Sequence, residues 1–263
     1  MQEPSLQLQT PPFRQVHSGH GVQWWSSAWK LLFHRGAAAV WIVMCLIAAV
    51  IYVVLHVVPM LGWIAAHLAA FLFAGGLMLA ARKTDQATAP AVGDLFAGFG
   101  PPLGSLVIGA ALLMVAVLLI IGALAVGGAG AAFGAMFGGM TGNMGVLAGL
   151  GATSLLLLLA ALVLLIPIGM AAWLAPALIV LKQQPPVEAL KASLAACWAN
   201  VGALAVYGLL WIAFAIVASI PFGLGWLVLA PLTVLSTYAA YCDLFEADTL
   251  TPSPSPAAAG EGS

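Results

Sequence analysis

Two histidines are the first candidates for chemistry in this sequence, because each lies in a stretch that is almost free of other ionisable side chains. His56 stands just before a turn at Pro59, and His67 follows that turn. Side chains on either side of one turn can face each other and share a proton or a metal ion, and ionisable groups inside a membrane are functional candidates. The alternative, which we favour, is that both are polar residues near the membrane surface, where a neutral imidazole reaches water.

A glycine-rich segment at 127–152 contains two interleaved four-residue periods. Its repeating glycines are Gly130, Gly134, Gly138 and Gly142, and its repeating methionines are Met136, Met140 and Met144. Small residues four apart line one face of a helix and allow close approach of another helix, whereas methionine thioethers can bind copper(I). No cysteine or histidine lies near these methionines. We therefore expect no metal here and predict that the glycines pack against another helix or a second copy of the chain.

Three prolines interrupt the apolar stretches. They are Pro167, Pro176 and Pro231. A proline inside a helix frees a backbone carbonyl and kinks the helix, and broken helices form the substrate sites of some transporters. Kinks that only shape helix packing are the alternative, because no charged residue lies beside any of the three.

Four acidic residues lie at the ends of the apolar stretches and form no paired carboxylate site. They are Asp94, Glu188, Asp243 and Glu246. Each can cap a helix or pair with a basic residue such as Lys191 or Arg82. The sequence has no Ser/His/Asp order, no phosphate-binding loop and no metal-ligand spacing. We therefore predict no catalytic residue, no cofactor, no metal and no enzyme, and the net charge of −1 argues against binding to nucleic acid.

The composition indicates a membrane protein. Of the 263 residues, 63% are hydrophobic and 6% are charged, whereas soluble domains carry about 25% charged residues. Six stretches without Asp, Glu, Lys or Arg are long enough to cross a hydrocarbon core, which takes about 20 helical residues. They cover about 37–58, 63–81, 103–126, 153–181, 201–220 and 226–241. We predict an all-α integral membrane protein with six transmembrane helices in a domain at 19–246, a polar, flexible N-terminus at 1–18 and a disordered tail at 247–263.

The basic residues predict the orientation. They are Arg14, Lys30, Arg35, Arg82, Lys83, Lys182 and Lys191. All seven fall on one side if six spans alternate from the N-terminus, and cytoplasmic loops are enriched in Lys and Arg. We therefore place both termini in the cytoplasm and expect all seven except Arg14 to contact anionic lipid head groups. Segment 127–152 then either re-enters the membrane or covers its outer surface, because a further span would move Lys182 and Lys191 outside.

A short amphipathic stretch precedes each pair of spans. These stretches cover about residues 22–32, 92–99 and 187–197, and each has apolar residues at helical spacing opposite polar ones. Amphipathic helices of this kind lie in the membrane interface. The predicted architecture is therefore three units, each made of an interfacial helix followed by a hairpin of two spans.

Four stretches of the sequence carry a resemblance to a known family. They are Gly19-His20-Gly21 with Trp24-Trp25, Trp29 and Leu32-Phe33, then Asp94 to Phe99, then Trp173 to Ala177 leading into Pro186 to Ser193, and finally Tyr238 to Phe245. In this order they resemble a family of uncharacterised bacterial six-span inner-membrane proteins. That family is similar in plan to YciC-like envelope proteins and to the membrane domain of some glycerophosphodiester phosphodiesterases. The resemblance covers about residues 19–245, with Cys242 in place of an arginine, and implies a link to envelope lipids without catalytic residues.

These observations favour a bacterial inner-membrane protein that acts as a non-enzymatic scaffold or factor in envelope and lipid homeostasis. Its expected partners are membrane lipids, with anionic head groups, and a second copy of the chain. One alternative is a small transporter or lipid-translocating protein with a cavity between the hairpin units. Another is a membrane immunity or regulatory partner protein.

Reporter fusions test the predicted orientation. Alkaline phosphatase, which is active only outside the cytoplasm, should be active when fused after residue 60 or 223 and inactive after residue 185 or 250. A fluorescent protein that folds only in the cytoplasm should give the opposite pattern. Phosphatase activity after residue 185 would contradict the orientation, because Lys182 and Lys191 would then lie outside.

Overall fold

The computed structural model describes residues 13–142 and 144–246, without the side chains of Arg35 and of residues 144–151. The predictions for the first twelve residues and for the tail at 247–263 lie outside this part of the chain. Within it the helices are α1 (His20–Leu32), η1 (His34–Gly36), α2 (Ala38–His56), α3 (Leu61–Asp85), η2 (Val92–Phe99), α4 (Leu103–Thr141), α5 (Met144–Leu181), α6 (Pro186–Ala199), α7 (Val201–Ser219) and α8 (Trp226–Phe245). The described residues form no strand, which confirms the all-α prediction.

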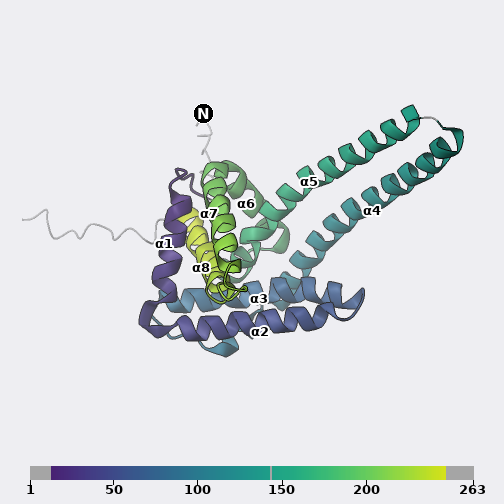
Figure 1. Cartoon of the computed structure of the whole chain (residues 1–263). Coiled ribbons are helices and arrows are strands. Elements are labelled where there is room, and N and C mark those ends of the chain that lie inside the picture. The colour runs from purple at the N-terminus through teal and green to yellow at the C-terminus, as the bar shows by residue number, and fades with distance from the viewer. Residues whose placement is uncertain (1–12, 143, 247–263) are drawn as a thin grey trace, which may run out of the picture.

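In the described part of the chain, six helices are long and apolar enough to cross a membrane, as the sequence predicts. They are α2, α3, α4, α5, α7 and α8. Figure 1 shows them as three hairpins that diverge, with α2 and α3 along the lower edge, α4 and α5 pointing to the upper right, and α7 and α8 upright beside α1. Helices α3 and α8 are the most buried of the six and also the least hydrophobic. They form the centre of the molecule. The other four helices are more hydrophobic because more of their surface faces lipid.

Each short helix packs on a hairpin other than the one that follows it in the chain. Helix α1 packs on α8 and α7, η2 packs on α3, and α6 packs on α5. Helix α1 buries Trp24, Trp25 and Leu32 against protein, while Val22 and Trp29 of its predicted apolar stripe stay exposed. The amphipathic pattern therefore identifies three helices, but part of each apolar face contacts a neighbouring hairpin instead of lipid.

Small residues allow these short helices to approach the spans closely. Gly98 of η2 lies so near α3 that a Cβ atom there would be 2.1 Å from the carbonyl oxygen of Leu72. On α6 the hydroxyl of Ser193 accepts a hydrogen bond from the Leu174 amide (3.1 Å) and donates one to the Met170 carbonyl (2.6 Å). These two backbone groups of α5 would bond each other in a regular helix, so Ser193 is inserted into the hydrogen-bond ladder of α5.

Helices α4 and α5 are longer than the predicted spans 103–126 and 153–181. Segment 127–152, expected as a separate re-entrant or surface element, instead continues both helices as the far end of their hairpin. Helix α4 has 39 residues and measures about 58 Å, roughly twice the hydrocarbon thickness. The segment contains no charged residue that would interrupt the helix. Helix α4 ends at Thr141, where Gly142 with its left-handed backbone (φ 65°) forms the C-cap.

A pair of substitutions in η2 tests the close packing on α3. Gly98→Ala should lower the free energy of unfolding by about 1–3 kcal/mol, because the added methyl group overlaps the Leu72 carbonyl. Gly93→Ala is the matched control, since a Cβ atom at Gly93 meets nothing within 4 Å. Thermal unfolding of the purified protein in detergent measures both, and equal midpoints would contradict this packing.

Candidate functional site

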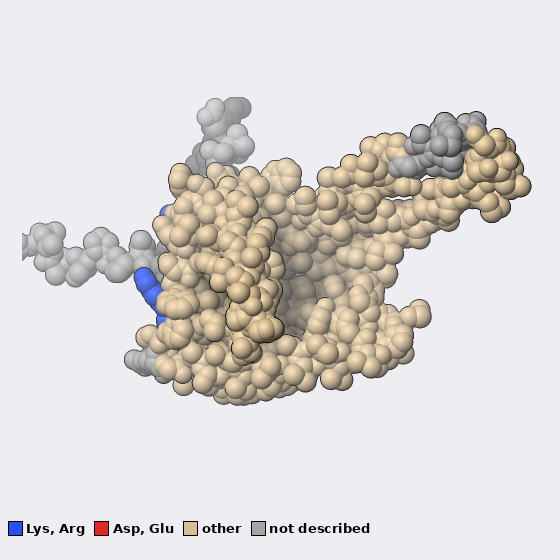
Figure 2. All heavy atoms as spheres, in the orientation of Figure 1, with Lys and Arg blue, Asp and Glu red and all other residues tan. Residues whose placement is uncertain are grey.

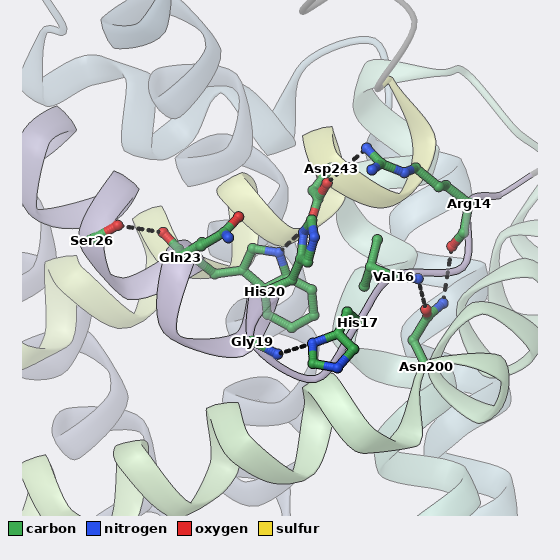
Figure 3. Close-up of polar contacts among 10 residues, drawn as sticks. Arg14, Val16, His17, Gly19, His20, Gln23, Ser26, Asn200 and Asp243 are labelled. Carbon is green, nitrogen blue, oxygen red and sulfur yellow. Dashed lines mark hydrogen bonds and ion pairs between the residues drawn. The ribbon is translucent and has the colours of Figure 1, made fainter.

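The last two turns of α8 carry the carboxylates on which a polar cluster is built. Asp243 lies 2.7 Å from His20 Nδ1 and accepts a hydrogen bond from Trp24 Nε1 at 2.9 Å, both through its Oδ2 atom. Arg14 lies 3.5 Å from the other carboxylate oxygen. Figure 3 shows Arg14 and His20 converging on Asp243. We call Asp243, Glu246 and the groups bonded to them the polar junction.

The segment before α1 is bound to the end of α8 by its backbone. The Arg14 amide donates to the Leu244 carbonyl at 2.7 Å, and the Val16 amide donates to Asn200 Oδ1 at 2.7 Å. Asn200 returns a hydrogen bond from Nδ2 to the Arg14 carbonyl at 3.1 Å, as Figure 3 shows. Residues 13–18, which the sequence assigns to the polar N-terminus, therefore connect α8 with the junction of α6 and α7.

Glu246 extends the polar junction to α3. Its carboxylate pairs with Arg82 and accepts a hydrogen bond from the Tyr241 hydroxyl at 2.6 Å. One turn earlier, the Tyr238 hydroxyl donates to Asp85 at 3.0 Å. The C-terminal residues of α3 and α8 are thus joined by two polar contacts, both at the end of the spans.

Two lysines complete the contacts at this end of the helices. Lys182 Nζ donates to the Phe245 carbonyl at 2.8 Å, where a cation stabilises the negative end of the helix dipole of α8. Lys83 Nζ lies 2.6 Å from Asp94, which also accepts the Ala91 amide at 2.9 Å. Asp94 therefore fixes the start of η2 to the end of α3.

An aromatic cluster lies beside the polar junction. The rings of Trp24 and Trp173 are 6.0 Å apart, and that of Tyr207 lies 5.9 Å from Trp24 and 5.2 Å from Trp173. Trp25 stacks on Tyr207 at 5.1 Å. These contacts bring α1, α5 and α7 together, and pairs of aromatic rings at such distances stabilise beyond their burial.

The basic residues predicted to contact anionic lipid have different surroundings. Arg82 pairs with Glu246, Lys83 with Asp94, and Lys182 donates to the Phe245 carbonyl. Lys191 makes a more exposed pair with Glu188 at 3.4 Å, and Lys30 is exposed on α1. The side chain of Arg35 lies outside the described part. Several of these cations thus bind the protein itself, which the sequence pattern alone does not reveal.

The two histidines of the first hairpin have separate hydrogen-bond partners. His56 Nδ1 lies 2.8 Å from the Tyr52 carbonyl of its own helix, on an exposed surface. His67 Nε2 lies 3.1 Å from the Ala110 carbonyl of α4. His67 therefore joins α3 to α4, and the described residues contain no group of three or more His, Cys, Asp or Glu that could hold a metal ion.

The four periodic glycines of α4 do not share one environment. Gly130 is exposed, Gly134 is half-buried and Gly138 is buried, whereas Gly142 ends the helix. A close contact with α5 is made one turn earlier by Gly127, where a Cβ atom would be 2.4 Å from Leu157 Cδ1. The sequence pattern missed Gly127 because it lies outside the four-residue period.

Three apolar hollows lie between the diverging helices. One of 370 Å³ lies between α2, α3, α5 and α8, and its lining includes Tyr52, Trp173, Pro176 and Thr237. One of 540 Å³ lies between α1, α7 and α8. The third, of 650 Å³, lies between α5, α7 and α8, and Gly208 is part of its wall. Of the three prolines singled out in the sequence, Pro176 lines a hollow and Pro231 is buried in α8.

Over residues 13–142 and 144–246, these features define an all-helical fold with six helices capable of crossing a membrane and a polar junction at one end of them. The chain is similar to a probable inner membrane protein of Burkholderia thailandensis, with 37% identity over 91 residues. The match covers 30% of this chain and 33% of that protein, so the chain spans about a third of the length of this relative. No family model and no solved structure matches the chain.

Removing the central carboxylate tests the polar junction. Asp243→Ala leaves His20 and Trp24 without their acceptor, and it should lower the free energy of unfolding by about 1–3 kcal/mol. Glu188→Ala is the control, because its pair with Lys191 is exposed and such pairs contribute about 0–1 kcal/mol. Thermal unfolding in detergent compares the two variants, and an equal effect of both would show that the junction has no special role.

Proposed function

We propose that this chain is a multi-pass bacterial inner-membrane protein that acts as a non-enzymatic scaffold in envelope and lipid homeostasis, with both termini in the cytoplasm. The observation that carries the proposal is the set of apolar hollows between the diverging helices, whose charged ends are bonded to one another. The hollows measure 370–650 Å³ and are lined mainly by apolar side chains. Lipid acyl chains are the apolar groups most abundant around membrane helices, and we propose that they fill these hollows.

The contacts of the short helices support an architecture of three units. Helix η2 packs on α3, α6 packs on α5 and α1 packs on α8, so each binds the returning helix of a hairpin. For η2 and α6 this hairpin precedes the short helix in the chain, and α1 at the start packs on the last hairpin. We propose that the three units form a closed ring in this way, which would hold the hairpins apart and keep the hollows open to lipid.

The charge distribution supports a location within a membrane, with the charged residues at its surface. The face seen in Figure 2 is free of charged atoms except for Lys and Arg side chains at one margin. The similarity to the probable inner membrane protein of Burkholderia thailandensis supports the bacterial inner membrane as the location. Lipids are the proposed partners, including anionic lipids at basic residues that keep an uncompensated charge.

A small transporter is the second candidate, and one observation favours it. The 370 Å³ hollow is bounded by helices of all three hairpins, and its lining includes Tyr52, Thr233 and Thr237 as well as Pro176. A proline inside a helix leaves a backbone carbonyl available to bind a substrate. Substrate-dependent transport into vesicles that contain the purified protein would favour this candidate over the scaffold.

Filling a hollow tests the lipid-binding scaffold. Gly208→Phe projects a ring into the 650 Å³ hollow, and nothing lies within 4 Å of a Cβ atom at Gly208. Mass spectrometry of the protein purified in mild detergent should then find fewer co-purified lipids per molecule than in the original protein. Gly122→Phe is the control, because Gly122 also has open space but lies on α4, away from this hollow. Unchanged lipid content in Gly208→Phe would overturn the proposal.

A further inference from the structure

We propose that a hollow between α1, α3 and α8 binds the head group of a zwitterionic phospholipid that carries a primary amine. The ligand class is phosphatidylethanolamine, with its phosphate at Lys30 and its ammonium group at Asp85. This inference rests on the proposed function, because it requires the end of α8 to lie at the membrane surface. It adds the identity of the lipid and the residues that select it.

The hollow is lined by both kinds of charge. Its volume is 360 Å³, and Gln23, Ser27 and Lys30 of α1 lie across from Asp85 of α3 and Tyr238 of α8. Lys30 and Asp85 are exposed, and no ion pair joins them among the described residues. A cation and a carboxylate that share one hollow without pairing are complementary to a ligand that carries both charges.

Two further polar groups of the hollow, Asp243 and Tyr238, already make hydrogen bonds within the protein. Asp243 is also part of the lining, but its carboxylate already binds His20 and Trp24. Tyr238 donates its hydroxyl to Asp85 Oδ2 at 3.0 Å, which orients the Asp85 carboxylate. An ionised carboxylate has about four acceptor positions, so Asp85 can accept an ammonium group as well.

The local charge argues against an anionic lipid in this hollow. A phosphatidylglycerol head group would place its one negative charge near both Lys30 and Asp85, so the attraction of the first would be offset by the repulsion of the second. A phosphoethanolamine group presents a phosphate to Lys30 and an ammonium group to Asp85. Hydrogen bonds between charged groups are the stronger kind, and both would form with this ligand.

The hollow also has the right depth for a head group. Helix α8 has 20 residues, and a helix of that length is about 30 Å long and crosses the hydrocarbon core once. Tyr238 lies in the second-to-last turn of α8 and Asp85 ends α3, and Leu31 and Ala239 add apolar surface to the lining. Acyl chains could therefore continue toward the bilayer from a head group held at this level.

Native mass spectrometry of the full chain in detergent tests the inference. The protein is titrated with phosphatidylethanolamine and phosphatidylglycerol of identical acyl chains, and with soluble phosphoethanolamine. The original protein should prefer phosphatidylethanolamine over the other two. Asp85→Asn keeps the acceptor for Tyr238 but removes the charge, so it should weaken phosphatidylethanolamine binding about tenfold and raise the affinity for phosphatidylglycerol. Lys30→Gln should weaken both lipids, and Lys30→Arg should restore them.

Lys191→Gln is the matched control, since Lys191 is an exposed lysine on α6 that lies outside the hollow, and it should leave the preference unchanged. A preference for phosphatidylglycerol in the original protein, or an unchanged preference in Asp85→Asn and Lys30→Gln, would overturn the inference. Binding of soluble phosphoethanolamine as tight as that of the lipid would identify a site for a free metabolite and would also overturn it. Lipids retained in the apolar hollows without head-group preference would contradict this inference alone, whereas loss of all bound lipid would contradict the proposed function.

Discussion

The structure depends on carboxylates at the end of one helix. Asp243 and Glu246 stand at the end of α8, and between them they bind α1, α3 and the segment before α1. The carbonyl groups of the same turn bind Arg14 and Lys182. Within lipid, the hydrophobic effect does not drive six apolar helices to associate. Polar contacts at the ends of the helices therefore help to determine which hairpins pack together.

This arrangement changes how the basic residues of the chain are interpreted. A cluster of Lys and Arg at one end of the spans predicts attraction to anionic lipid, yet Arg82, Lys83 and Lys182 each bind a protein group. The surface left for the proposed lipid partners has mixed charge and lies beside apolar hollows. Such a surface would recognise a lipid head group by its shape and by a pair of opposite charges. It is less suited to recognition by net positive charge.

The sequence predicts the helices well because hydropathy and helix length are local properties. It predicts neither the extension of α4 to Gly142 nor the partners of Asp243. The extension of α4 is not predicted for two reasons. Glycine disfavours helix, and this segment has no charged residue that would mark where the helix ends. The partners of Asp243 are not predicted because His20 and Asp243 are 223 positions apart, and composition carries no information on contacts over that distance. The one available signal was that both residues lie in stretches that carry the family resemblance.

A charge-reversal cycle on Arg82 and Glu246 tests most directly whether polar contacts at the end of α8 hold the hairpins together, since this pair joins α3 to α8. Thermal unfolding in detergent is measured for Arg82→Glu, for Glu246→Arg and for the double variant. Each single reversal should lower the unfolding midpoint, and the double variant should recover most of the loss, because the attraction is restored with its partners exchanged. A double variant whose loss equals the sum of the two single losses would show that the ends of the spans are held together by something else.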